Sequence, residues 1–117
     1  ETKLINLKMI IYNITITVEP IIVNEWLIWM RKNHIPDVLQ TGCFVNAKIS
    51  KIISTQLEEN TFAIAYKCRN IDDYNNYKEV HSDRLRREYM DLYGKNTILF
   101  RTMLEEIEDF NYCRKGF

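Results

Sequence analysis

The sequence predicts an α+β fold, a ferredoxin-like βαββαβ sandwich with an antiparallel four-stranded sheet. Two short runs of alternating apolar residues, 43–53 and 61–68, lie between two helical patterns. A strand-like run precedes the first helical pattern, and another follows the second. Consecutive elements usually pack as neighbours and crossovers are right-handed, so this order fits few topologies, and the split βαβ sandwich is the simplest of them.

The composition is typical of one compact domain. A chain of 117 residues can bury enough apolar surface to fold without disulfides or a structural metal. Its 16 basic and 16 acidic residues cancel, which argues against nucleic acid and against an anionic membrane as partners. No apolar run approaches the roughly 20 residues of a bilayer-spanning helix, so we expect a cytoplasmic protein.

We expect residues 9–107 to form the domain. The first strongly patterned stretch opens at Met9, so we interpret residues 1–8 as a non-native or disordered extension and Met9 as the natural start. Residues 108–117 are expected to form a C-terminal tail that is either frayed or bound to a partner.

The first strand is expected over 10–18, where the even positions are apolar and most odd positions are polar. Pro20 ends this strand, and Asn24 is the candidate N-cap of the helix that follows. One side of that helix carries an apolar stripe that also includes a histidine. The members of the stripe are Val23, Trp26, Leu27, Met30 and His34.

Pro36 is expected to break or kink this first helix. Proline has no backbone N–H, and it disfavours the helical conformation at the preceding residue. A short helical turn over 36–40 follows, and Gly42 is its expected left-handed stop.

The second and third strands should each bury one face, with a charged connection at 56–60 between them. Alternation assigns the inward positions. The expected inward residues are Cys43, Val45, Ala47, Ile49 and Ile53 in the second strand, and Phe62, Ile64, Tyr66 and Cys68 in the third.

The second helix is expected to begin at a cap formed by Asn70 or Asp72. Ser82 offers a second capping position, so a break in the helix is expected close to it. Gly94 should end the helix, and the last strand follows over 97–104. The expected inner stripe is Tyr74, Tyr77, His81, Leu85 and Leu92.

In this sandwich both helices cover one face of the sheet and leave the other face open. Apolar patches larger than a few hundred Å² usually mark an interface, so we predict a homodimer formed through the open sheet face. The alternative is a monomer whose segment 105–117 folds back across the sheet. The residues expected on the open face are Ile11, Phe44, Leu99 and Met103, together with Thr15, Thr17, Ala63 and Ala65.

The candidate catalytic residues are His34, Asp37 and His81. Both histidines lie on apolar stripes near an interruption of their helix, and an imidazole beside a carboxylate can move protons near neutral pH. The alternative is that both histidines are half-buried packing residues and that Asp37 only favours the start of the short helix. Arg101 is a lone charge within an apolar strand, so it binds an anionic ligand, pairs with a carboxylate or reaches water at a strand edge.

The candidate ligand-binding residues are Trp26, Met30, Tyr77 and Arg101. Aromatic side chains at these spacings either line a cavity between helices and sheet or belong to the core. The charged run 83–88 is interpreted as a solvated helix face. The further aromatic candidates for a cavity are Tyr12, Trp29, Tyr66 and Tyr74.

Several activities found on this architecture lack their signatures here. The expected third strand lacks the basic, glycine and aromatic pattern of an RNA-recognition domain. A metallochaperone would carry paired cysteines after the first strand, where this chain has Glu19 and Pro20. Three glycines at positions 42, 94 and 116 cannot form a phosphate-binding glycine-rich loop.

Several blocks of residues resemble one protein family. They include Met9 to Asn13, Glu25-Trp26, the block His34-Ile35-Pro36-Asp37-Val38, and Phe100-Arg101-Thr102. Together they resemble the small bacterial proteins of domain-of-unknown-function family 4286, from Met9 to about Glu106. The resemblance implies a dimeric α+β barrel, a shape shared with small monooxygenases, haem-degrading enzymes, lactone isomerases and ligand-sensing domains. It implies no activity, because fold does not carry function.

We therefore expect a homodimer that binds a small organic molecule between helices and sheet. If it is catalytic, we expect cofactor-independent proton transfer or oxygenation, with His34 as base, Asp37 orienting it, and His81 or Arg101 stabilising an oxyanion. The competing expectation is a structural or protein-interaction module without turnover, in which both histidines only pack.

Overall fold

The computed structural model describes residues 8–53 and 60–113. The order of its elements confirms the predicted β-α-β-β-α-β arrangement. The first helical segment comprises η1, α1, η2 and α2, and the second comprises α3, η3 and α4. The elements are β1 (Ile10–Val18), η1 (Pro20–Ile22), α1 (Val23–Trp29), η2 (Met30–His34), α2 (Ile35–Gln40), β2 (Asn46–Lys51), β3 (Thr61–Cys68), α3 (Ile71–Asn76), η3 (Tyr77–His81), α4 (Ser82–Tyr93) and β4 (Thr97–Glu105).

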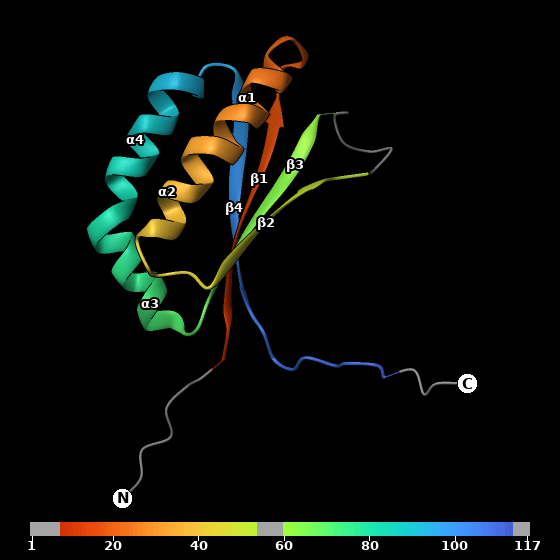
Figure 1. Ribbon diagram of the computed structural model, residues 1–117, viewed down its shortest axis with the longest axis vertical. Helices are drawn as coiled ribbons and strands as arrows, with labels where there is room; N and C mark the ends of the chain where they lie inside the picture. The colour runs from red at the N-terminus through yellow and green to blue at the C-terminus, as the bar shows by residue number, and fades with distance from the viewer. Residues whose placement is uncertain (1–7, 54–59, 114–117) are drawn as a thin grey trace, which may run out of the picture.

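The four strands form one antiparallel sheet in the order β2-β3-β1-β4. Both helical segments lie on the same face of this sheet (Figure 1). In the register of the sheet, Tyr12 of β1 lies opposite Tyr66 of β3 and Met103 of β4. Residues that lie opposite each other point to the same face, so this register assigns a face to every position of the sheet.

The core lies between the sheet and the helices. Every even-numbered residue of β3 is buried, which confirms the inward pattern predicted for that strand. Fully burying such an apolar side chain contributes roughly 1.5–3 kcal/mol. The largest buried side chains of the core are Trp26, Tyr12, Tyr66, Ile16, Met30, Ile64 and Leu85.

Neither long helix is broken, which corrects both predicted interruptions. Each helix passes through one π-helical turn, in which the N–H of residue i bonds to the carbonyl of residue i−5. The N–H of Ile35 bonds to the carbonyl of Met30, and the N–H of Ser82 bonds to that of Tyr77. Because Pro36 has no N–H to donate, the wider turn before it lets the helix continue. Ser82 does not cap a new helix; its hydroxyl donates back to the Lys78 carbonyl at 2.7 Å.

The helix termini match the predictions in part. Asn70 caps α3 as predicted, accepting from the Asp73 N–H at 2.9 Å. Asn24 caps nothing, because Pro20 already starts a 3₁₀ turn and the first helical segment therefore begins before Asn24. Gly42 has the predicted positive φ, 79°. Gly94 ends α4 with a helical φ, and there a Cβ would meet the Met90 carbonyl oxygen at 2.6 Å.

The predicted inner stripe of the second helix is wrong at its C-terminal end. Leu92 is 53% exposed, whereas Tyr89 and Tyr93 are buried. Their rings pack against Trp29, at centroid distances of 6.0 and 5.3 Å. The C-terminal half of α4 therefore faces α1, and this neighbour turns the buried stripe away from Leu92.

The second strand is shorter than predicted. It spans Asn46–Lys51, where Ala47 and Ile49 face the core as expected. Val45 and Ile53 lie outside it, and both are exposed. Most of the predicted connection at 56–60 lies outside the described residues, as do residues 1–7 of the predicted N-terminal extension.

The open sheet face is apolar over β4 and polar over β2, and some of its members differ from the prediction. The register places Leu99 and Met103 on the helix side, opposite Ile16 and Tyr12. Phe44 is buried against Tyr77, with ring centroids 4.8 Å apart. We define the open sheet face by its apolar and threonine residues, which are Ile11, Thr15, Thr17, Ala63, Ala65, Ile98, Phe100, Thr102 and Leu104.

The described part of the C-terminal tail covers only one end of this face, where Glu106 and Asp109 border a hollow with Ile11 and Ala65. The Glu106 N–H donates to the Met9 carbonyl at 2.9 Å, and the Glu106 carboxylate lies 3.5 Å from Lys67. Beyond that point the chain leads away from the sheet (Figure 1). Ile98 and Phe100 remain 78% and 61% exposed.

Candidate functional site

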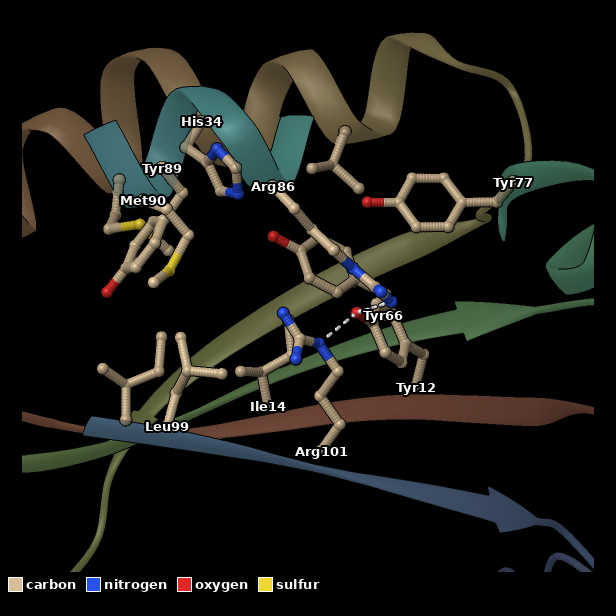
Figure 2. A pocket seen from close by; sticks show the side chains of 13 residues that line it. Tyr12, Ile14, His34, Tyr66, Tyr77, Arg86, Tyr89, Met90, Leu99 and Arg101 are labelled. Atoms are coloured by element: carbon tan, nitrogen blue, oxygen red, sulfur yellow. Dashed lines mark hydrogen bonds between the residues drawn. The ribbon is translucent and has the colours of Figure 1, made fainter. Parts of the chain in front are cut away.

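One cavity lies between the helices and the helix side of the sheet (Figure 2). It has room for water over about 30 Å³, inside a wider hollow of about 440 Å³ that opens to solvent. Its walls come from β1, η2, α2, β3, η3, α4 and β4. The polar residues on its walls are Tyr12, His34, Tyr66, Tyr77, Arg86, Tyr89 and Arg101, and the apolar ones are Ile14, Ile16, Met30, Val38, Met90 and Leu99.

Four predicted site residues line this cavity, namely Met30, His34, Tyr77 and Arg101. Trp26 does not; it is fully buried, and its indole N–H donates to the Tyr89 hydroxyl at 3.0 Å. Of the additional aromatic candidates, Tyr12 and Tyr66 line the cavity, whereas Trp29 and Tyr74 do not.

The π-helical turn of the first helical segment positions His34. It is the last residue of η2, and its ring lies between Trp29 and Tyr89 at centroid distances of 5.0 and 5.6 Å. Burial lowers the pKa of His34 from 6.5 to about 4, although the nearby charge of Asp37 acts in the opposite direction. The imidazole is therefore neutral at pH 7 and able to accept a proton.

Asp37 and His81 do not join His34 at the cavity wall. Among the described residues, no hydrogen bond links Asp37 to His34, so Asp37 acts on the imidazole through its charge. His81 ends the second π-helical turn and is half-buried. Its ring stacks on Tyr77 with centroids 6.4 Å apart, and it is Tyr77 that reaches the cavity.

Two arginines converge on one phenol at the mouth of the cavity. Arg101 Nε donates to the Tyr12 hydroxyl at 3.0 Å, and Arg86 Nη2 donates to the same oxygen at 3.2 Å. Figure 2 shows that the two side chains approach from opposite layers, Arg86 from α4 and Arg101 from β4. We call Tyr12, Arg86 and Arg101 the arginine cluster.

Arg86 is the site residue that sequence reasoning missed. The charged run 83–88 suggested a solvated helix face, but Arg86 is half-buried and its Nε is fully buried. The available signal was its position next to Leu85, which is 1% exposed. A residue beside a buried position lies at the border of the buried stripe, where a long side chain can turn inward.

Three buried polar atoms around the cavity have no hydrogen-bond partner among the described residues. They are His34 Nδ1, the Tyr66 hydroxyl and Arg86 Nε. Burial raises the pKa values of Tyr66 and Tyr77, so both phenols stay neutral at physiological pH. The cavity thus combines a neutral base, neutral phenols and two cations with an apolar wall.

Within residues 8–53 and 60–113, no group of three or more His, Cys, Asp or Glu side chains could hold a metal ion. Nor is any helix of that part of the chain long and apolar enough to cross a bilayer. The three cysteines are free, with Cys43 and Cys68 buried as predicted. Burial raises the pKa of the Cys68 thiol to about 12, which makes it unreactive at neutral pH.

Solved structures share this fold at low sequence identity. A dimeric ferredoxin-like protein from an uncultured marine organism superposes with a TM-score of 0.68 at 8% identity, over 90% of this chain and 99% of that one. An ethyl tert-butyl ether d (ethd) family protein from Bacillus halodurans gives 0.65 at 14% identity, over 84% and 99%. A candidate antibiotic biosynthesis monooxygenase from Nitrosomonas europaea gives 0.64 at 11% identity, over 90% and 96%. These likenesses confirm the ferredoxin-like fold.

No curated protein matches the chain significantly. Residues 9–107 match a family model described as "Domain of unknown function (DUF4286)".

Proposed function

This chain belongs to the DUF4286 family, a domain of unknown function, and we propose that it is a homodimer that binds a small organic molecule in the cavity between helices and sheet. One observation carries the proposal. The three unpartnered buried atoms belong to residues that line a single cavity. An unsatisfied buried polar group costs about 1–3 kcal/mol, so three such groups around one space favour a polar guest there.

In a catalytic form of this function, His34 is the base. Its lowered pKa keeps it ready to accept a proton from an acidic C–H or O–H of the bound molecule. Arg101 of β4 lies on the wall of the same cavity, and it stabilises the oxyanion that this proton transfer produces. The anion is then reprotonated at another atom, or it reacts with molecular oxygen. The structural likeness to a candidate monooxygenase supports testing the second route.

The homodimer forms through the open sheet face. Ile98, Phe100 and Leu104 are exposed there, and contiguous apolar surface of this kind usually marks an interface. The likeness to a dimeric ferredoxin-like protein supports the same assembly. Light scattering at micromolar concentration should give twice the chain mass of 14.1 kDa, and a mass of one chain would contradict the dimer.

A thermal-shift screen of small metabolites tests ligand binding. Compounds that bind the folded protein raise its melting temperature. His34→Gln should abolish or reduce those shifts, whereas His81→Gln, outside the cavity, should preserve them. Equal shifts in the wild type and His34→Gln would remove His34 from the site.

The second candidate function is a protein-interaction module without turnover. It is favoured by the small space for water, about 30 Å³, and by the exposed apolar residues Ile107, Phe110 and Tyr112 of the tail. If no compound in the screen stabilises the protein, this function is preferred. The proposed location is the cytoplasm, which stays a prediction from the sequence.

A further inference from the structure

The arginine cluster carries more positive charge than its surroundings compensate. The described ion pairs are Lys8 with Glu105, Lys67 with Glu106, and Arg69 with Asp73. Within the described residues, neither Arg86 nor Arg101 lies in an ion pair; both donate to the Tyr12 hydroxyl. Two guanidinium groups that share one acceptor and have no carboxylate partner there repel each other, so the cluster favours an added negative charge.

Arg86 keeps one buried donor that no described residue accepts from. Its Nη2 is used by Tyr12, while its Nε is buried without a partner. The Nε and Nη donors of a guanidinium form a fork that matches the two oxygens of a carboxylate. A carboxylate at this position would pair with Nε and would also lie close to the second cation.

The walls of the cavity describe the rest of the ligand. Ile14, Leu99 and Val38 are aliphatic, and the rings of Tyr12 and Tyr77 lie 6.0 Å apart. Such a wall fits a flat, apolar body better than a sugar or a nucleotide. Tyr66 is only 1% exposed, and its unpartnered hydroxyl can meet one polar substituent of that body.

The space requires side chains at the mouth to move on binding. Met90 is 52% exposed, so its side chain can rotate outward without unpacking the core, while Arg101 stays at the mouth to meet the carboxylate. This rotation would widen the cavity, which has room for water over about 30 Å³.

We propose that the ligand is a small aromatic carboxylate whose carboxylate group is bound by Arg86 and Arg101 and whose ring lies against the apolar wall of the cavity. This inference rests on the proposed ligand-binding function and adds the chemical class of the ligand. It assigns Arg86 and Arg101 to charge recognition and the aliphatic wall to the ring.

The test compares acids with their neutral amides by isothermal titration. The probes are benzoate, cinnamate and indole-3-acetate, each paired with its primary amide, with acetate as an anion that has no ring. We expect at least one acid to bind ten-fold or more tightly than its amide, and acetate to bind at least ten-fold more weakly than that acid. Arg86→Gln and Arg101→Gln should each reduce the preference for the acid to less than three-fold. Arg87→Gln, an exposed neighbour on α4, should keep it.

The possible outcomes test the carboxylate inference separately from ligand binding in the cavity. If acids and amides bind equally, or if Arg86→Gln keeps the preference, the carboxylate inference is overturned while ligand binding in the cavity stands. If neither acids nor amides bind at 10 mM probe, a concentration at which even about millimolar affinity would be seen, the carboxylate inference is overturned, and the thermal-shift screen alone decides whether the cavity binds a ligand. Circular dichroism of each variant confirms that it is folded.

Discussion

Tyr66 and Tyr89 are both buried phenols, but their hydroxyl groups have different surroundings. The Tyr89 hydroxyl accepts from Trp26 and donates to Thr97, each at 3.0 Å, whereas the Tyr66 hydroxyl has no partner among the described residues. Tyr66→Phe should therefore be neutral or should raise the free energy of unfolding by about 1 kcal/mol. Tyr89→Phe should lower it by about 1–3 kcal/mol. Urea unfolding at fixed protein concentration measures both, and a large loss in Tyr66→Phe would show that its hydroxyl is satisfied.

His34 should make stability depend on pH in a defined window. Its pKa is about 4 in the folded protein and 6.5 as the ordinary value, so the unfolded chain binds a proton that the folded one refuses between these values. Stability therefore falls as the pH drops from 6.5 to 4, by on the order of 3 kcal/mol. The loss is complete below the folded pKa.

His34→Gln removes the group that binds this proton, so the free energy of unfolding should depend less on pH between 6.5 and 4. The matched variant His81→Gln retains His34 and is expected to retain the slope. Urea unfolding from pH 4 to 8 provides the measurement. Parallel curves for the wild type and His34→Gln would contradict the buried, neutral histidine.

At the scale of elements, the two asparagines considered as helix caps make a matched pair. Asn70 accepts from the Asp73 N–H at the start of α3, whereas Asn24 is exposed and caps nothing. Asn70→Ala should lower the free energy of unfolding by about 1 kcal/mol, and Asn24→Ala should change it by less than about 0.5 kcal/mol. Equal effects of the two substitutions would contradict the assigned caps.

The limits of sequence prediction also lie at this scale. Alternation identified β1 and β3 because β3 buries every second residue and β1 does so at every even position except the half-buried Ile14. It could not assign β4, where Leu99 and Phe100 are both apolar and only the register with β1 decides which faces the helices. Likewise Pro36 and Ser82 indicated a disturbance in each helix, but a break and a π-helical turn leave the same local signal.

The candidate site was predictable to a similar degree. Four site residues could be recognised in the sequence because of the apolar patterns around them. Met30 and Tyr77 continue such a pattern, whereas His34 and Arg101 interrupt one. Arg86 carried little, since a charge within a charged run is usually solvated. Its role depends on the distance to Tyr12, 74 positions away in the sequence, which no local pattern contains.

For the whole molecule, the open sheet face decides the assembly. Phe100→Glu places a charge on the apolar part of this face, opposite Thr15, and should convert the proposed dimer to a single chain. Ile28→Glu makes the same change at an exposed position on α1 and should leave the mass unchanged. Light scattering on both variants at equal concentration measures the result. If Phe100→Glu keeps the mass of two chains, the dimer uses another surface.

The position of β4 at the border of the sheet has a consequence for handling and expression. Among the described residues no strand pairs with its outer backbone groups, and the same segment presents Ile98 and Phe100 to water. Free amides next to apolar side chains can template cross-β growth, so an uncovered copy is prone to aggregate. A substitution that separates the proposed partners would therefore also lower the yield of native protein.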